Sequence, residues 1–158
     1  MSAMVTVRRA TEGDLPRLLA VASQLGEETH WPWRFSAKNA GNLMHAYISA
    51  EDTEALIAYL HGEPAGLALI AWDYEFSEEP IGYISKFYVA PFARGTPVAR
   101  AMMRAACAWF DHHGCVSAFA MGTANIPSQG QRFNNLLGKF GFSPCAKTLV
   151  RSVEHVKA

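Results

Sequence analysis

The stretch that decides the fold covers residues 83–114 and reads YISKFYVAPFARGTPVARAMMRAACAWFDHHG. Its first seven residues alternate in polarity and are rich in β-prone side chains, which predicts a strand ending at Val89. After a short loop, Thr96 is a favoured N-cap residue and Pro97 suits the first position of a helix. Apolar residues then recur at helical spacing as far as Gly114, a common helix stop. The stretch therefore predicts a strand, a short loop and an amphipathic helix.

The start of this helix is a candidate anion site. The first N–H groups of a helix have no partner within it, and the helix dipole is positive at this end. Gly95 would let a ligand approach the backbone closely, and Arg94 adds positive charge beside it. The alternative is an ordinary, well-capped connection. The local pattern alone favours that alternative, because one glycine beside one arginine is a weak motif.

The segment VAPFARGTPVARAMM resembles motif A of the GNAT superfamily, the acetyl-CoA-dependent N-acetyltransferases. In that family a strand ends in V-x-P, and an R-G-x-G-x-G/A loop then holds the coenzyme A pyrophosphate. The residues that match are Val89, Pro91, Arg94, Gly95 and Ala99. Two positions depart from the family: Phe92 replaces the usual Gln or Arg, and Pro97 replaces a glycine and removes one amide donor. The R-G-T-x-x-A form with a late Trp is closer to small GNAT-like proteins encoded by phages, a diverged branch.

Composition bounds the remaining possibilities. The 158 residues suit one domain, 1–158, and the 14 basic and 14 acidic residues leave no surplus of positive charge for a nucleic-acid partner. Three cysteines at no metal-ligand spacing indicate free thiols in a reducing compartment and no metal site. No signal peptide precedes Val5, and no apolar run is long enough to span a membrane. We therefore expect a cytoplasmic protein without a membrane partner.

The rest of the chain alternates between predicted strands and helices. Strands are predicted at residues 4–10, 53–60, 65–76, 83–89, 115–121 and 144–153, and helices at 11–26, 36–50, 96–114 and 128–139. Thr11 and Asp14 form a variant capping box at the first helix, and Gly26 would end it. A loop, residues 27–35, follows. Composition and periodicity alone establish only a mixture of α and β structure.

The order β-α-α-β-β-β-α-β-α-β is the GNAT order, and two further motifs also resemble that family. The chain opens with V-x-x-R-x-A-T-x-x-D-L, and its last predicted helix is followed by Gly141 and Phe142. The resemblance implies an α/β (α+β) fold, in which helices flank a mixed, mainly antiparallel sheet.

The resemblance also implies transfer of an acetyl group from acetyl-CoA to an amine of a small molecule or a protein. The backbone N–H near Val89 would polarise the thioester carbonyl. The cofactor-binding residues carried over from the family are Tyr88, Val89, Arg94, Gly95, Thr96, Val98, Ala99 and Asn125. Asn125 could equally be a turn residue before a proline.

The general base is not identified by the sequence. Strict alternation places Tyr83, Ser85 and Phe87 on one face of the key strand and Ile84, Lys86 and Tyr88 on the other, with no carboxylate on either face. Leu137 stands where many relatives carry a tyrosine that protonates the thiolate. The catalytic candidates are Glu28, His30 and Tyr88, and the substrate candidates are Trp31, Trp33 and Ser85. Each could instead be a solvated or a packed side chain.

Two other functions stay open. The chain could be an inactive GNAT-like module with a structural or regulatory role, because no base is evident. It could also be a nucleobase-modifying relative, although its neutral charge disfavours this. Exposed sheet edges could pair two copies into a homodimer.

Overall fold

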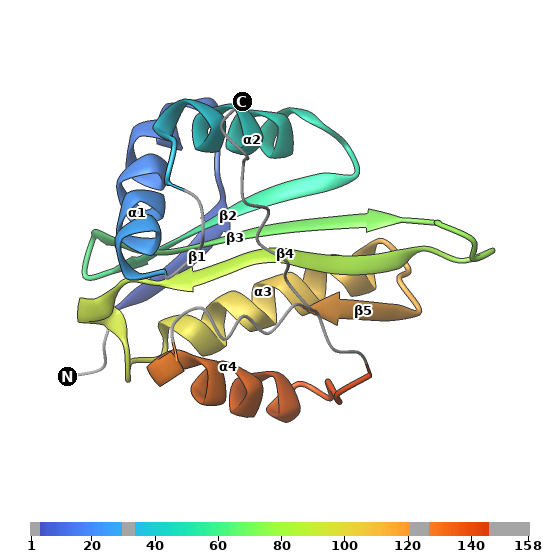
Figure 1. The fold of residues 1–158 in the computed structure, drawn as a ribbon. Helices are drawn as coiled ribbons and strands as arrows, with labels where there is room; N and C mark the ends of the chain where they lie inside the picture. The colour runs from blue at the N-terminus through green and yellow to red at the C-terminus, as the bar shows by residue number, and fades with distance from the viewer. Residues whose placement is uncertain (1–3, 30–33, 121–126, 146–158) are drawn as a thin grey trace, which may run out of the picture.

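The computed structural model describes residues 4–29, 34–120 and 127–145. These residues form one five-stranded sheet in the order β1-β2-β3-β4-β5, in which only β4 and β5 are parallel (Figure 1). The strands are β1 (Val5–Arg9), β2 (Thr53–Leu60), β3 (Glu63–Asp73), β4 (Ile81–Val89) and β5 (Ser117–Ala120). The α-helices are α1 (Leu15–Glu28), α2 (Ala37–Ser49), α3 (Val98–His112) and α4 (Pro127–Lys139).

These elements confirm the predicted fold class, a mixed and mainly antiparallel sheet flanked by helices. The predicted order of strands and helices is also confirmed from β1 to α4. Of the predicted last strand, residues 144 and 145 lie in irregular structure, and residues 146–153 fall outside the described part of the chain.

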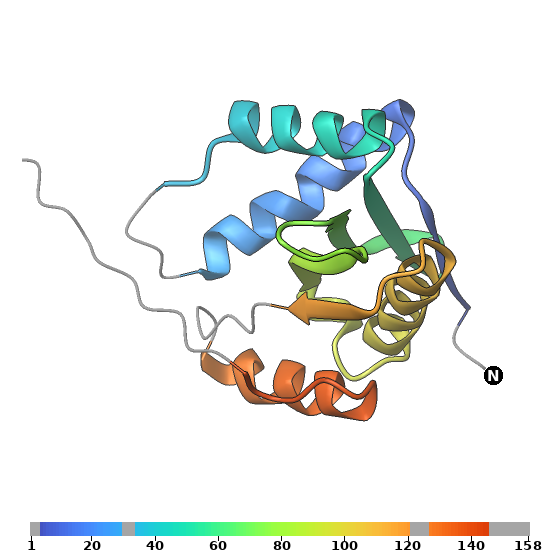
Figure 2. The same ribbon diagram turned by 90° about the vertical axis from the view of Figure 1, so that its right-hand side faces the viewer.

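Helices cover both faces of the sheet. In Figure 1, α1 and α2 lie above the sheet and α3 and α4 lie below it, and Figure 2 shows the same layers after a quarter turn. Alternation along β2 explains this arrangement, since Ile57 packs in the core beneath α1 and α2 while Leu56 packs in the core against α3. The central strand β3 is apolar towards both cores. No helix among the described residues is long and apolar enough to cross a bilayer.

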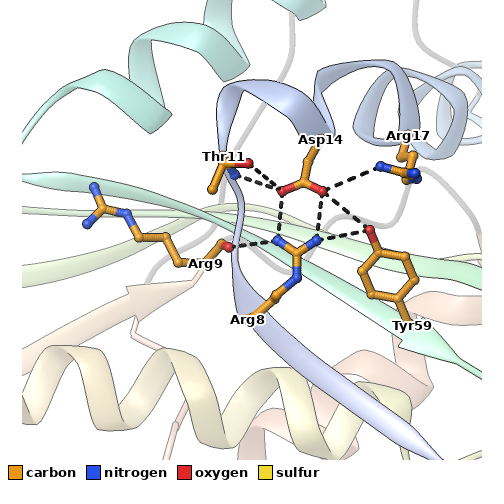
Figure 3. A network of polar contacts seen from close by, with 6 residues as sticks. All are labelled: Arg8, Arg9, Thr11, Asp14, Arg17 and Tyr59. Carbon is orange, nitrogen blue, oxygen red and sulfur yellow. Dashed lines mark hydrogen bonds and ion pairs between the residues drawn. The ribbon is translucent and has the colours of Figure 1, made fainter. Parts of the chain in front are cut away.

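A buried carboxylate joins β1 to the start of α1 (Figure 3). The side chain of Asp14 is 4% exposed and accepts two hydrogen bonds from the Arg8 guanidinium, at 2.7 and 2.8 Å. It also accepts one from the backbone N–H of Thr11 at 2.8 Å, as the predicted capping box requires. The Tyr59 hydroxyl of β2 lies 3.4 Å from the same carboxylate. One side chain therefore ties together two strands and the entrance to a helix.

Helix α1 continues two residues beyond Gly26, so the predicted helix end is wrong. Gly26 does not have the positive φ of a helix-terminating glycine. A Cβ at this position would instead lie 2.7 Å from the side chain of Phe35, just before α2. The glycine is explained by this close contact. The extension places Glu28 in the last turn of α1 rather than in a loop.

Helix α3 begins at Val98, one residue later than predicted, with Pro97 at the N-cap. The Thr96 hydroxyl donates a hydrogen bond to the Ala93 carbonyl at 2.6 Å and accepts one from the Val98 N–H at 3.4 Å. Thr96 was predicted to be the N-cap residue. It lies one residue before the N-cap, and its hydroxyl still accepts a hydrogen bond from the first residue of the helix. At the other end, Gly114 has a φ of 70° just beyond α3, which agrees with its predicted role.

Strand β4 contains one extra residue. Leu69 of β3 pairs with Lys86, whereas the next residue, Ile70, pairs with Ile84. Ser85 is therefore unmatched in the pairing, and β4 has a bulge at this point.

The bulge changes which side chains share a face, so the predicted faces of β4 are wrong. Ser85 and Tyr88 both face α1 and α2, since the Ser85 hydroxyl lies 2.8 Å from that of Tyr47 in α2 and Tyr88 packs in the core with α1. Ile84 and Phe87 both pack in the opposite core. The prediction assumed strict alternation, which fails across a bulge.

Candidate functional site

The end of β4 presents a backbone amide to one edge of the sheet. Within the described residues, β4 pairs with β5 only from Ile81 to Ile84. On the side of β3, the Ala90 N–H donates a hydrogen bond to the Ala65 carbonyl at 2.8 Å. Because successive amides point to opposite sides of a strand, the Val89 N–H points towards the side of β5. A ligand lying along this edge can accept a hydrogen bond from it.

A groove of about 570 Å³ adjoins this edge. Its walls are the end of β4, the loop from β4 to α3, the first turn of α3 and one side of α4. Gly95 lies in the wall with a φ of 78°, which favours glycine, and a Cβ there would meet no atom within 4 Å. The backbone at the start of α3 is therefore open to a ligand in the groove.

The groove is positively charged. Arg100 of α3 and Arg132 and Lys139 of α4 line it with exposed side chains, and no acidic residue in the described part of the chain does so. None of these three side chains forms an ion pair within residues 4–29, 34–120 and 127–145. The N-terminal end of the α3 dipole adds positive potential at the same place. The groove therefore has the charge and the open amides that a phosphate-bearing ligand needs.

Glu28, Tyr88 and Arg94 form a polar cluster beside the groove. The Arg94 guanidinium donates to both carboxylate oxygens of Glu28, at 2.8 and 2.5 Å, and the Tyr88 hydroxyl donates to one of them. The Arg94 Nε also donates to the Val89 carbonyl at 3.2 Å. The ion pair is largely sheltered, with 17% and 26% of the two side chains exposed. The cluster ties the end of α1 to the end of β4 and to the loop that follows it.

The contacts in this cluster fix the protonation state of each group. The Arg94 hydrogen bonds lower the pKa of the Glu28 carboxyl despite its partial burial, and the Tyr88 hydrogen bond acts in the same direction. Burial is the main cause that raises the pKa of Tyr88, and the Glu28 carboxylate raises it further. At neutral pH, Glu28 is therefore a weakly basic carboxylate and Tyr88 keeps its proton.

The structure brings most of the residues expected to bind coenzyme A to the groove. Tyr88, Val89, Arg94, Gly95, Thr96 and Ala99 line it. Val98 is fully buried and offers only its backbone. The guanidinium of Arg94 is held by Glu28, so its charge is already partly neutralised. Asn125 lies outside the described residues.

The expected substrate and base residues are only partly placed. Ser85 lies on the same face as Tyr88, and its hydroxyl also donates a hydrogen bond to the Leu69 carbonyl at 3.1 Å. Residues 30–33, which include His30, Trp31 and Trp33, lie outside the described part of the chain.

Sequence reasoning missed the α4 side of the groove. Gln129, Arg132, Phe133, Leu136 and Lys139 line it. These positions are separated by three, one, three and three residues, the spacing of one helix face. This spacing could have identified one shared face on α4. The sequence alone does not show which part of the chain that face lies against.

A family model described as the acetyltransferase (GNAT) family matches residues 18–142. The chain belongs to this family. The match extends from α1 to just beyond α4, so it includes every described wall of the groove. Among functionally curated proteins, no sequence matches this GNAT chain.

Solved structures share the fold at low sequence identity. The aminoglycoside N-acetyltransferase AAC(6')-Iy, in complex with CoA, superposes with a TM-score of 0.77 at 16% identity, with 98% of each chain covered. A transcriptional regulator from Bacillus halodurans gives 0.76 at 18% identity and covers 95% of this chain and 100% of its own. A Clostridium acetobutylicum protein described as a predicted acetyltransferase with acetyl-CoA gives 0.71 at 19% identity, with coverages of 94% and 96%. At these identities the likeness establishes the fold alone.

Proposed function

We propose that this chain is an N-acetyltransferase that transfers an acetyl group from acetyl-CoA to an amine of a small molecule or a protein. One observation carries the proposal: a cationic groove runs from the open start of α3 to the Val89 amide at the edge of β4. The positive start of a helix can bind a pyrophosphate, and a free amide at the strand end can polarise a thioester carbonyl. Acetyl-CoA needs these two features at opposite ends of one site. Two of the solved structures with this fold contain CoA or acetyl-CoA, which supports the same ligand here.

The residues at the groove fit acetyl-CoA. Among the described residues, the N–H groups of Gly95 and Ala99 have no partner and would hold the pyrophosphate. The N–H groups of Thr96 and Val98 donate to the Ala93 carbonyl and the Thr96 hydroxyl and would have to exchange these bonds for the ligand, and Pro97 has no N–H. Arg100, Arg132 and Lys139 would supply the positive charge that Arg94 shares with Glu28. Phe92 does not line the groove and is 54% exposed, so the apolar side chain at this position does not close it.

The chemistry supplied by acetyl-CoA is an activated acyl group, whose C–S bond breaks as a C–N bond forms to the amine. The Val89 N–H would stabilise the negative charge that develops on the carbonyl oxygen. Tyr88 lines the groove at the same end of β4 and is the proposed proton donor to the departing thiolate. Its one hydroxyl proton, now donated to Glu28, would pass to the sulfur, and the proton lost by the amine would restore it. Glu28 would position Tyr88 through their hydrogen bond rather than take the amine proton, because its pKa is lowered. His30 remains a candidate base.

Titration calorimetry with acetyl-CoA and with free CoA tests the groove. We expect micromolar binding by the native protein and a loss of about 100-fold or more in Gly95→Asp, because a carboxylate beside a pyrophosphate costs several kcal/mol. Gly62→Asp is the matched control. Gly62 also has a positive φ and open space around it, but it lies in the β2–β3 turn, so this change adds the same charge and backbone strain away from the groove. Equal affinity in the two variants would overturn the proposed site.

Release of free thiol from acetyl-CoA in the presence of an amine panel tests the reaction. We expect thiol release that depends on the amine, with acetylated product detected by mass spectrometry. Both carboxylate oxygens of Glu28 are bonded to Arg94, so Glu28 is not free to act as a base. This favours one alternative, a non-catalytic module that binds CoA. Binding of acetyl-CoA without turnover of any amine would support that alternative and refute the enzyme.

A further inference from the structure

The hairpin between β3 and β4 has an unusual concentration of negative charge. Residues 73–80 read DYEFSEEP, and residues 73–85 include no Lys, Arg or His. The side chains of Asp73, Glu75, Glu78 and Glu79 are all exposed. Two exposed aromatic side chains stand among them, since Tyr74 is 50% exposed and Phe76 is fully exposed. Two exposed rings among several carboxylates make this turn a candidate binding surface.

The acidic hairpin adjoins an aromatic pair on the sheet. Tyr83 of β4 lies directly opposite Phe119 of β5, and the two rings stack with centroids 5.9 Å apart and planes 18° apart. Phe119 is 44% exposed. The nearby Glu75 carboxylate, together with burial, raises the pKa of Tyr83 to about 12. The hairpin carboxylates and the stacked rings therefore form one continuous surface, here called the acidic aromatic surface.

This surface leads to the site of acyl transfer. Tyr83 and Ser85 are two residues apart on β4 and share the face that carries α1 and α2. Tyr88 lies on the same face after the bulge. The cationic groove occupies the other end of β4, together with α3 and α4. Ser85 and Tyr88 are covered by α2 and α1, so the path left to an acceptor is the edge of β4 beyond Ile84, which has no partner strand among the described residues.

The length of this path limits which acceptors can contact both the hairpin and the reaction centre. Val89 lies six positions beyond Tyr83, and because the bulge takes up one of them the span is about 17 Å. A short diamine or a single amino sugar that reaches the reaction centre does not extend back to the hairpin carboxylates. An extended peptide of about six residues covers the same span.

We propose that the acidic aromatic surface binds the acceptor as an extended cationic peptide, whose reactive amine lies near Val89 and whose Lys or Arg side chains contact the hairpin. This inference rests on the proposed function and adds the acceptor class to it. The hairpin carboxylates attract the cationic side chains, and the stacked Tyr83 and Phe119 rings offer a face for a guanidinium. The neutral total charge of the chain makes this local surface, not the whole molecule, the source of selectivity.

Peptide binding tests the surface without any need for turnover. The probe is a fluorescent octapeptide with a free N-terminal amine and arginine at positions five to eight, and its control carries neutral citrulline at those positions. By fluorescence anisotropy at low salt, we expect the arginine peptide to bind at least about tenfold more tightly, and the difference to shrink at high salt. Equal binding of the two peptides would overturn the inference.

Charge-neutralising variants locate the effect on the protein. We expect Glu75→Gln/Glu79→Gln to weaken binding of the arginine peptide about three- to tenfold. The matched control, Glu63→Gln/Asp111→Asn, removes two exposed carboxylates, one at the start of β3 and one on α3 beyond the opposite face, and should leave binding unchanged. An equal loss in both variants would refute the assignment to the hairpin.

Turnover separates this inference from the proposed function. If thiol release favours the arginine peptide over the citrulline peptide and over the short diamine putrescine, both proposals stand. If putrescine and other short amines are acetylated as well as the arginine peptide, the enzyme stands and the peptide acceptor is refuted. If acetyl-CoA does not bind at all, the proposed function fails, and the anisotropy result decides the peptide surface by itself.

Discussion

Replacement of Asp14 by asparagine should remove a large part of the stability of this chain. The carboxylate accepts hydrogen bonds from Arg8, Thr11 and Tyr59 while almost completely buried, and Arg17 lies 3.9 Å away (Figure 3). An asparagine keeps one acceptor oxygen but turns an NH₂ group towards other donors. The substitution therefore removes the negative charge, and it also places the NH₂ group of the asparagine against side chains or backbone groups that are themselves hydrogen-bond donors.

The expected loss can be worked out from these contacts. Each hydrogen bond to a charged group contributes about 1.5–3 kcal/mol, and Asp14→Asn would lose or weaken the two from Arg8. Arg8 is about half exposed, with 48% of its side chain accessible, so water recovers part of that energy. We expect the free energy of unfolding to fall by about 3 kcal/mol. At about 3 °C per kcal/mol for a chain of this size, the melting temperature should fall by about 9 °C.

Urea unfolding monitored by circular dichroism measures this change. The matched control is Glu12→Gln, which neutralises an exposed carboxylate two residues away that contacts His45, with both side chains more than half exposed. This control should change stability by less than about 0.5 kcal/mol. A loss below about 1 kcal/mol in Asp14→Asn, or an equal loss in both variants, would refute the reasoning.

The pH dependence of the same pair gives an independent check. The Arg8 hydrogen bonds hold the pKa of Asp14 well below its ordinary value despite burial. A lowered pKa in the folded state contributes stability above the unfolded pKa of about 3.9 and loses it as the pH falls further. The stability gap between the native protein and Asp14→Asn should therefore be constant above pH ~5 and should narrow below pH ~4. A gap that does not change between about pH 6 and about pH 2.5 would contradict an ionised Asp14.

Two further substitutions test the packing around the site. Glu28→Gln should lower the free energy of unfolding by about 1–2 kcal/mol, because it weakens the tie from α1 to Arg94, whereas the exposed neighbour Glu27 should tolerate the same change in a urea titration. Gly82→Ala should cost about 1–3 kcal/mol, because its Cβ would lie 2.5 Å from the Phe110 ring, while Gly138→Ala in α4 meets no atom and should add up to about 1 kcal/mol by thermal melting. Equal effects at Gly82 and Gly138 would contradict the packing described.

Much of the fold was accessible from local patterns in the sequence. Strand β2 and helix α2 were predicted nearly to the residue, because Ser36 caps the helix and the strand ends at a turn with His61 and Gly62. Both signals act over a few residues. The order of the strands in the sheet required the family resemblance, because pairing partners lie far apart in the sequence.

The misplaced features depend on contacts between distant residues. Gly26 was interpreted as a helix end because its contact with Phe35 cannot be deduced from local sequence. The bulge at Ser85 was missed because the alternating pattern of β4 looks regular until it is paired with β3. The contact between Glu28 and Arg94 joins residues 66 positions apart, so no local motif indicates it.

The bulge in β4 also divides the strand into two parts that can change independently. From Ile81 to Ser85, one parity of residue numbers faces α1 and α2, and from Phe87 to Val89 the opposite parity does so. Deletion of a single residue between them would restore regular alternation and move Tyr88 away from Glu28. With the extra residue in place, the first part can acquire new side chains for a different acceptor without altering what the second part presents to the groove. In the proposed enzyme, side chains on the first part would contact the acceptor, and those on the second part would contact acetyl-CoA.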